Sequence, residues 1–386
     1  MGKLPGMEAA IAALASTWRT ERAERQARRQ LDKSDFDALR EAGLWRSVVP
    51  KDVGGAWVDM AHSARALCES FRRLAGADSS VTLVSAMHPS VVSFWLANPD
   101  PSQPQWEEQR AAIFASAAAG DQWGTVTSEP GSGGDIAQTR AVAKPTDAAL
   151  SLPGRTYAVT GDKHFGSGLG VSDWMMTTAI PEGEAAAAVF VLDVRDWESN
   201  PRIQLLGEWD GMGMASTQSH AVRLDGVPAV RMARNDPIEQ ILAASGPFVL
   251  LLFTAVVVGI VDEAIATARA QLEPKADQLR AYERVEWARA EQDHWLATQA
   301  YEGALHTLES GDHSAAEHAA RRAKQSVADL AEGTLRRLSR VLGGGTFSRR
   351  SPFAHWYEDV RALGFLRPPW GLAYDALFAT SFGNHD

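Results

Sequence analysis

The sequence predicts an α+β protein with more than one domain, in which helices come first, short strands lie in the middle and long helices follow. Stretches with few glycines or prolines fill the first and last thirds of the 386 residues, and short β-prone runs alternate with turn residues between them. A hydrophobic content of 45% is ample for a large core. We place an N-terminal α-helical domain at residues 1–120, a central β domain at 121–232 and a C-terminal helical bundle at 233–386.

The N-terminal third shows helical patterns separated by turns. Ser34 is the expected N-cap of the second pattern because an acidic turn follows it, and Gly43 fits the end of that helix. His88, next to Pro89, is interpreted either as a lining residue of a substrate pocket or as a residue that caps a helix end. The expected helices cover residues 9–31, 35–40, 60–75, 80–96 and 106–118.

The middle third consists of short β-prone runs that alternate with Gly, Pro and Asp. This pattern is typical of a β domain built from short strands and turns. Residues 184–188 are interpreted as a loop. The expected strands cover residues 157–160, 174–179, 188–192 and 220–224.

The last third is helical again. Residues 248–272 are apolar on nearly every side, so we expect this helix at the centre of a bundle. Its most apolar part, residues 248–261, is shorter than the roughly 20 residues of a bilayer span, so we interpret it as buried and expect no membrane span. Amphipathic helices are expected at residues 278–310 and 314–341, and a final helix at residues 370–380.

The composition excludes several classes of function. A net charge of −10 argues against nucleic acid as a partner, which requires a basic surface. The single cysteine, Cys68, permits no disulfide within the chain, which indicates a reducing compartment. No Cys and His residues have the spacing of a zinc site, and no signal peptide precedes the first helix. We therefore expect a cytoplasmic enzyme without a metal.

Two segments rich in glycine and hydroxyl groups are the most informative part of the sequence. The first, residues 123–135, runs from a β-prone stretch into Ser-Glu-Pro-Gly-Ser-Gly-Gly-Asp, and the second, residues 161–168, reads Gly-Asp-Lys-His-Phe-Gly-Ser-Gly. Such loops offer backbone N–H groups and hydroxyls without bulky side chains, which suits a flat polar ligand. The hydroxyls of Thr127, Ser128 and Ser167 are alternatively ordinary turn residues.

These segments, with the order of the domains, resemble the acyl-CoA dehydrogenase superfamily over nearly the whole chain. Residues 36–44, 49–50 and 54–55 fit the opening helix and turn of that family, and residues 128–135 fit its best-known motif. Residues 161–163 begin its second flavin loop, and residues 343–359 resemble its C-terminal motif. The resemblance implies the acyl-CoA dehydrogenase fold: an N-terminal helical domain, a central β-barrel-like domain and a C-terminal four-helix-type bundle.

The resemblance also implies a flavin between the β domain and the bundle, with FAD favoured over FMN, in a homotetramer or homodimer. Carried over by position, Thr127 and Ser128 bind the pyrimidine edge of the ring, Phe165 stacks near it, and Ser167 lies near N5 as a candidate catalytic residue. Three further residues, Gly343, Gly344 and Gly345, are implied to lie against the cofactor of a neighbouring subunit. The implied cofactor-binding segments also include Trp123, Thr125, Gly133, Gly134 and Gly166.

The sequence departs from the dehydrogenase pattern at the catalytic base. The usual glutamate position falls on Arg367, and the second known base position falls on Val249. Arginine is effectively always protonated and cannot accept a proton. Arg367 is therefore interpreted either as a surface arginine before a Pro-Pro turn or as a catalytic residue that faces the pocket and stabilises an anionic substrate or a flavin peroxide.

Three functions remain open from the sequence. The first is an FAD-dependent oxidoreductase that desaturates an acyl-thioester-like substrate, with electron-transfer flavoprotein as a candidate partner. The second is a two-component flavin monooxygenase that hydroxylates an aromatic or natural-product substrate with reduced flavin from a reductase. The third is a catalytically silent flavin-binding subunit. In each catalytic case the substrate is a small molecule, in the first case linked to CoA or a carrier protein.

Overall fold

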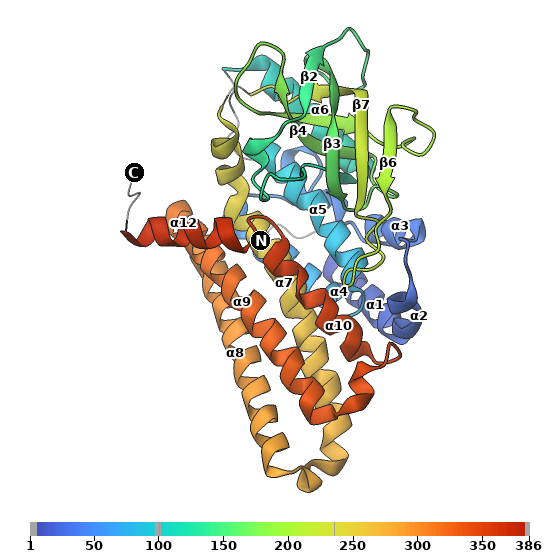
Figure 1. Cartoon of the computed structure of the whole chain (residues 1–386). Coiled ribbons are helices and arrows are strands. Elements are labelled where there is room, and N and C mark those ends of the chain that lie inside the picture. The colour runs from blue at the N-terminus through green and yellow to red at the C-terminus, as the bar shows by residue number, and fades with distance from the viewer. Residues whose placement is uncertain (1–5, 97–99, 101, 235, 383–386) are drawn as a thin grey trace.

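The structure is a computed structural model that describes residues 6–96, 100, 102–234 and 236–382. Figure 1 shows a β domain at the top, N-terminal helices beside its base, and a long helical bundle that extends below. Segments far apart in the sequence meet where the β domain joins the bundle, so this junction is the place to search for a site.

The expected helix at residues 60–75 matches α4 at both ends, and the other expected N-terminal helices begin one or two residues earlier than predicted. The first expected helix is divided between α1 and α2, and the N-cap of α3 is Asp32, not Ser34, because the Asp32 side chain accepts a hydrogen bond of 2.9 Å from the Ser34 amide. The elements are α1 (Met7–Thr20), α2 (Arg22–Ala27), α3 (Lys33–Glu41), η1 (Trp45–Val48), η2 (Lys51–Val53), α4 (Met60–Ala75), α5 (Ser79–Leu96) and α6 (Pro104–Ala119).

Five strands of the central domain close into a barrel in the order β4, β2, β3, β7 and β5, because β5 also pairs with β4. Strand β1 adds to β4 in parallel, and β6 adds to β7. The barrel has its own apolar interior, separate from the larger core of the helices. The strands are β1 (Trp123–Thr125), β2 (Val142–Pro145), β3 (Thr156–Gly166), β4 (Trp174–Pro181), β5 (Ala188–Asp193), β6 (Ile203–Gly207) and β7 (His220–Arg231).

Strand β3 corrects one expectation from the sequence. Most of the second glycine-rich segment, Gly161 to Gly166, belongs to this strand and is not a loop. The pairing of β3 with β7 shifts register between Val159 and Gly161 and again between Lys163 and Gly166. These irregularities bend the strand and redirect its side chains, as β-bulges do.

The C-terminal helices pack around α7, which runs the length of the bundle in Figure 1. Helix α7 begins at Ile238 and contains Pro247, so it is longer than the sequence predicted. By length and composition Ile238–Gln278 could cross a membrane, but 72% of its most apolar window is buried within the protein, as in a core helix. The elements are α7 (Ile238–Leu272), η4 (Glu273–Gln278), α8 (Ala281–Glu309), α9 (His313–Leu342), η5 (Gly344–Phe347), α10 (Pro352–Val360), α11 (Ala362–Phe365) and α12 (Trp370–Phe382).

Candidate functional site

The two glycine-rich segments lie side by side at the end of the barrel. The His164 amide donates a hydrogen bond of 2.8 Å to the Ser128 carbonyl, which joins the loop after β1 to strand β3. Behind them, the Val126 amide donates to the Met176 carbonyl at 2.8 Å, and the Thr177 hydroxyl donates to the Val126 carbonyl at 2.7 Å. The barrel wall therefore fixes Thr127 and Ser128 at one edge of a shared surface.

A buried ion pair holds the shape of the first loop. Lys163 is fully buried, and its ammonium group donates to Glu129 and to the Thr178 carbonyl, the latter at 2.7 Å. Glu129 also accepts from the Arg140 amide at 2.7 Å and from the Thr139 hydroxyl. Burial alone would raise the pKa of Glu129, but these hydrogen bonds outweigh it and lower that pKa below its usual value. Glu129 therefore helps to fix the shape of the first loop.

Backbone strain is concentrated in the same region. Among the described residues, the non-glycine residues with positive φ are Phe165, Met214 and Gln218, at 57°, 51° and 48°. All belong to β3 or to the segment before β7, and such conformations cluster at functional sites. The Phe165 ring is 59% exposed and lies edge-on to Trp209, with 6.1 Å between the ring centroids.

Arg367 reaches this surface from the other end of the sequence. Its guanidinium donates to the Ser128 hydroxyl at 3.0 Å. Next to it, a Cβ atom on Gly134 would lie 2.7 Å from Pro369, so the loop and the 367–369 segment are in close contact. Arg367 is therefore partly buried against the first loop, and its predicted catalytic role stays a prediction.

Two cations lie close together here: Arg367, within the 367–369 segment, and Lys324, beside it. Lys324 of α9 is buried and donates to the Pro368 carbonyl at 2.8 Å. Burial lowers the pKa of Lys324 to about 8 and the pKa of Arg367 to about 10. In the described part of the chain, neither forms a salt bridge. The site is therefore positively charged at neutral pH, although the whole chain is acidic.

The segment between β6 and β7 closes the surface on a further side. The Ser167 hydroxyl is 2.8 Å from the Ser219 hydroxyl, and the Met214 amide donates to Asp359 of α10 at 2.6 Å. Asp359 also accepts from the Ser79 hydroxyl at 2.5 Å, which ties the segment to both helical domains. Burial raises the pKa of Asp359 to about 6.

We expect Asp359→Asn to stabilise the protein at neutral pH by about 1–3 kcal/mol. The pKa of Asp359 is raised from 3.8 in the unfolded chain to about 6, so its contribution to stability is fully present below about pH 4 and is lost as pH rises through 6. Asparagine keeps the acceptor for Met214 and carries no charge. Urea unfolding at pH 7.5 should show the gain, which should shrink towards pH 4.5, and a gain of equal size at both pH values would contradict this account.

Comparison with known proteins gives a consistent picture. No protein-family model matches the chain. The chain is 27% identical over 352 residues to the amino sugar nitrososynthase DnmZ of Streptomyces peucetius, covering 86% of this chain and 82% of that protein. FMN-bound TdsC from Paenibacillus sp. A11-2 superposes with a TM-score of 0.79 at 19% identity, covering 97% of each chain. KijD3 was solved with FMN and dTDP-3-amino-2,3,6-trideoxy-4-keto-3-methyl-D-glucose. It superposes with a TM-score of 0.80 at 21% sequence identity, covering 98% of this chain and 94% of the KijD3 chain.

The matches cover 86% of the chain for the sequence relative and 97–98% for the solved structures. The chain belongs to the acyl-CoA dehydrogenase-like superfamily of flavin-dependent oxidoreductases. In this flavoprotein N-terminal helices come first, a five-stranded barrel follows and C-terminal helices come last, which agrees with the fold class that the sequence predicted. The nature of the flavin and the specific reaction are questions for the proposal below.

The structure of the flavoprotein separates the predicted site residues into groups. The first group lies on the two glycine-rich segments or, in the case of Arg367, against them. Its members are Thr125, Thr127, Ser128, Gly133, Gly134, Phe165, Gly166, Ser167 and Arg367. The Thr125 and Thr127 hydroxyls are 3.3 Å apart, and a Cβ on Gly133 would meet nothing within 4 Å, so this part of the cradle is open. Hydroxyls, open glycines and a nearby cation fit the polar edge of a flavin ring.

Trp123 requires a correction. Its indole is fully buried in the core, stacked on Trp174 with 5.7 Å between centroids and in contact with Trp95. Its N–H donates to the Ser116 hydroxyl at 3.2 Å. The side chain therefore anchors β1 to the helices and does not reach the surface where the flavin is expected.

The glycines at 343–345 lie apart from the other predicted residues. They follow α9 at the end of the bundle that Figure 1 shows away from the barrel. A Cβ on any of them would meet nothing within 4 Å. They do not join the site of their own chain, and their predicted contact with the cofactor of a neighbouring subunit stays a prediction.

His88 has a structural role in this flavoprotein. Its Nδ1 accepts a hydrogen bond of 3.2 Å from the Trp123 amide, and Nε2 lies 3.2 Å from the Trp45 carbonyl. Burial lowers the pKa of His88 to about 3, so the ring is neutral at pH 7. Neither a pocket-lining role nor a helix-end role is correct, because His88 lies inside α5 and connects it to two neighbouring segments.

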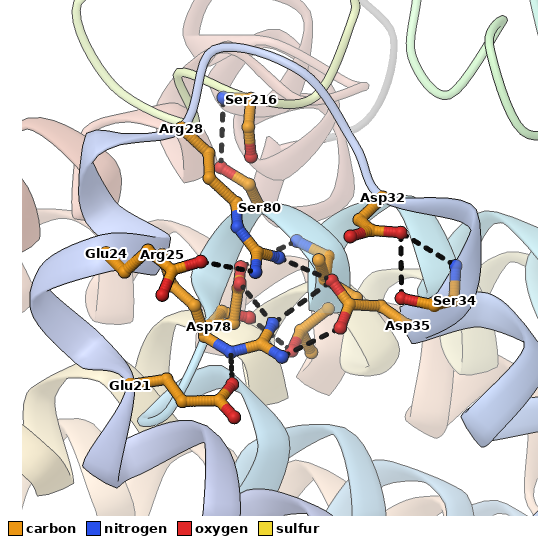
Figure 2. Close-up of polar contacts among 12 residues, drawn as sticks. Glu21, Glu24, Arg25, Arg28, Asp32, Ser34, Asp35, Asp78, Ser80 and Ser216 are labelled. Carbon is orange, nitrogen blue, oxygen red and sulfur yellow. Dashed lines mark hydrogen bonds and ion pairs between the residues drawn. The ribbon is translucent and has the colours of Figure 1, made fainter.

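Sequence reasoning missed a buried ionic network beside the site. Figure 2 shows Arg25 of α2 between Asp35 and Asp78, at 2.7 and 3.1 Å, with Arg28 2.9 Å from Asp35. The Ser216 amide, from the segment before β7, donates weakly to Ser80 at 3.4 Å. A pocket next to this network is also lined by Asp359. No local sequence motif marks the network, because its members come from separate elements.

Proposed function

We propose that this flavoprotein is the oxygenase component of a two-component flavin-dependent monooxygenase, which takes reduced FMN from a reductase and uses O₂ to oxygenate a small organic substrate. The observation that carries the proposal is the hydrogen bond from the Arg367 guanidinium to the Ser128 hydroxyl. Arg367 stands at the position where a dehydrogenase of this family has its catalytic base. A guanidinium with a pKa near 10 stays protonated at pH 7 and cannot remove a proton from a substrate.

The charge of the site supports reduced flavin as the ligand. Reduced flavin carries a negative charge on the pyrimidine side of its ring, and oxidised flavin is neutral there. In the orientation that the family resemblance implies, Ser128 and the Arg367 guanidinium bonded to it lie at that side, with Lys324 behind the Pro368 carbonyl. A cation placed where negative charge resides is a strong electrostatic contribution in a partly buried site.

The residues present fit a bound flavin, and their parts follow from their positions. Thr127 and Ser128 would hold the polar edge of the ring, the exposed Phe165 would cover it, and the open Gly133 would allow close approach of the backbone. The bound reduced flavin would supply the electrons that activate O₂. The protein would orient the ring and exclude water.

The comparisons support the finer parts of the proposal. TdsC and KijD3 were solved with FMN, which favours FMN over the FAD that the sequence first suggested. The names of relatives point to amino sugars and sulfur heterocycles as substrate classes to screen first. We further propose that the protein is cytoplasmic, because its single cysteine permits no disulfide within the chain. We also propose a homo-oligomer, because exposed apolar side chains such as Tyr282, Val285 and Trp295 lie along α8.

The test is a rapid-mixing experiment in which anaerobically reduced, FMN-loaded protein meets aerated buffer. We expect reoxidation in two resolved phases and slower release of hydrogen peroxide than from free FMN, because the site would shield bound flavin from bulk water. In Arg367→Ala the two phases should merge, with Arg336→Ala, at an exposed arginine of α9, as the matched control.

Other outcomes would contradict the proposal. Protein-bound flavin that resists O₂ for minutes would favour a dehydrogenase with another base, and acyl thioesters would then be the substrates to test. Reoxidation in a single phase at the rate of free FMN would indicate that the protein is a flavin-binding subunit without oxygenase activity.

A further inference from the structure

Three buried hydroxyls form a row that ends at Ser167. The Thr217 hydroxyl is 2.9 Å from the Met214 carbonyl and 2.7 Å from the Ser219 hydroxyl, which is 2.8 Å from that of Ser167. Thr217 is fully buried, and Ser219 and Ser167 are each 7% exposed. Ser167 is the member that belongs to the second glycine-rich segment, so the row reaches the site from behind.

The carbonyl at the end of the row fixes the direction of every hydrogen bond. A carbonyl only accepts, and two oxygen atoms 2.9 Å apart repel unless a hydrogen lies between them, so Thr217 donates its single hydroxyl hydrogen to the Met214 carbonyl. Thr217 can then only accept from Ser219, and Ser219, having used its hydrogen, can only accept from Ser167. The Ser167 oxygen therefore offers lone pairs to the site and no hydrogen.

The Met214 carbonyl is held firmly enough to impose this direction. The Met214 amide donates to Asp359 at 2.6 Å, and the Met214 carbonyl also accepts from the Trp209 indole at 2.9 Å and from the Thr217 amide at 3.2 Å. Met214 itself has a positive φ of 51°, a conformation that only surrounding contacts maintain. The row therefore has one stable polarity.

We propose that Thr217 and Ser219 are positioning residues that hold Ser167 as a hydrogen-bond acceptor and thereby make the site prefer reduced over oxidised flavin. This rests on the proposed function and on the position near flavin N5 that the family resemblance implies for Ser167. Oxidised flavin has only a lone pair at N5 and gains nothing from an acceptor, whereas reduced flavin carries an N5–H that can donate. The preference suits a protein that receives its flavin already reduced.

The test compares the Kd values of oxidised and reduced FMN for the full-length protein, by anaerobic titration. For the wild type we expect reduced FMN to bind more tightly. In Thr217→Val, an isosteric change, Ser219 loses its acceptor and turns to Ser167, which becomes free to donate. We expect the Kd of oxidised FMN to fall about three- to tenfold, the value of one hydrogen bond, with the Kd of reduced FMN nearly unchanged.

Three further variants sharpen the result. Ser219→Ala should act like Thr217→Val and serves if the valine variant does not fold. Thr217→Ser restores the hydroxyl and should keep the wild-type ratio of Kd values. Ser167→Ala should also reduce the ratio, but through weaker binding of reduced FMN. A merely structural row would weaken both states equally in all variants.

The outcomes separate this inference from the proposed function. Unchanged Kd ratios in Thr217→Val and Ser219→Ala would overturn the inference even if O₂ chemistry is found. The expected ratios in a protein without O₂ chemistry would support the inference and overturn the proposed function. Wild-type protein that binds neither form of FMN would overturn both.

Discussion

Replacing Lys163 with methionine is expected to lower the free energy of unfolding by about 3–5 kcal/mol and to abolish tight flavin binding. The ammonium group is fully buried and is the cation for Glu129, whose carboxylate organises the 127–135 loop. Methionine fills similar volume but leaves that carboxylate buried without its cation. Denaturant unfolding monitored by circular dichroism measures the first effect, and an FMN titration measures the second.

Lys144→Met is the matched control, because Lys144 is an exposed lysine on the neighbouring strand β2. Its stability should change by less than about 0.5 kcal/mol. If Lys163→Met lost stability but bound FMN normally, the ion pair would support the barrel without shaping the loop. A Lys163→Met protein as stable as the wild type would refute the buried pairing itself.

Replacing Arg25 with methionine is the second change with a large expected effect. Arg25 is the cation between Asp35 and Asp78, both buried (Figure 2). Burial already raises the pKa of Asp78, and removing the guanidinium would raise it further. We expect a loss of about 3–5 kcal/mol at pH 7.5, which becomes smaller as pH falls and the carboxyls take up protons.

Arg29→Met provides the comparison for Arg25, since Arg29 is exposed and its guanidinium contacts only backbone carbonyls of Ala27 and Arg28. Unfolding curves for both variants at pH 5 and 7.5 are sufficient. An Arg25→Met loss that does not depend on pH would show that packing, and not the unpaired carboxylates, causes the instability.

The sequence predicted the fold well where local patterns decide structure. The helices of the bundle and the barrel strands β3, β4, β5 and β7 were recognised because apolar spacing and turn residues report them directly, whereas the short strand β2 was missed. Strand β3 was cut short at Gly161 because glycines usually end a strand, whereas here bulges carry the strand on to Gly166. The start of α7 was missed because Pro247 lies within the helix.

The site was predictable in part. The glycine-rich segments could be found because their residues are contiguous, and Arg367 was singled out by its position relative to Asp359. Thr217 and Ser219 could not be found, since isolated hydroxyl residues carry no pattern and only the fold brings them beside Ser167. Trp123 was misplaced because its position in the sequence does not reveal that its side chain points into the core.

The hydrogen bond between Arg367 and Ser128 joins residues 239 positions apart. Contacts across such long separations require most of the chain to be ordered first, because closing a long loop costs entropy before any contact repays it. During refolding, the barrel and the bundle should therefore form before the surface between them is complete. Uptake of flavin would then report the last step of assembly, later than any signal from the helices or strands alone.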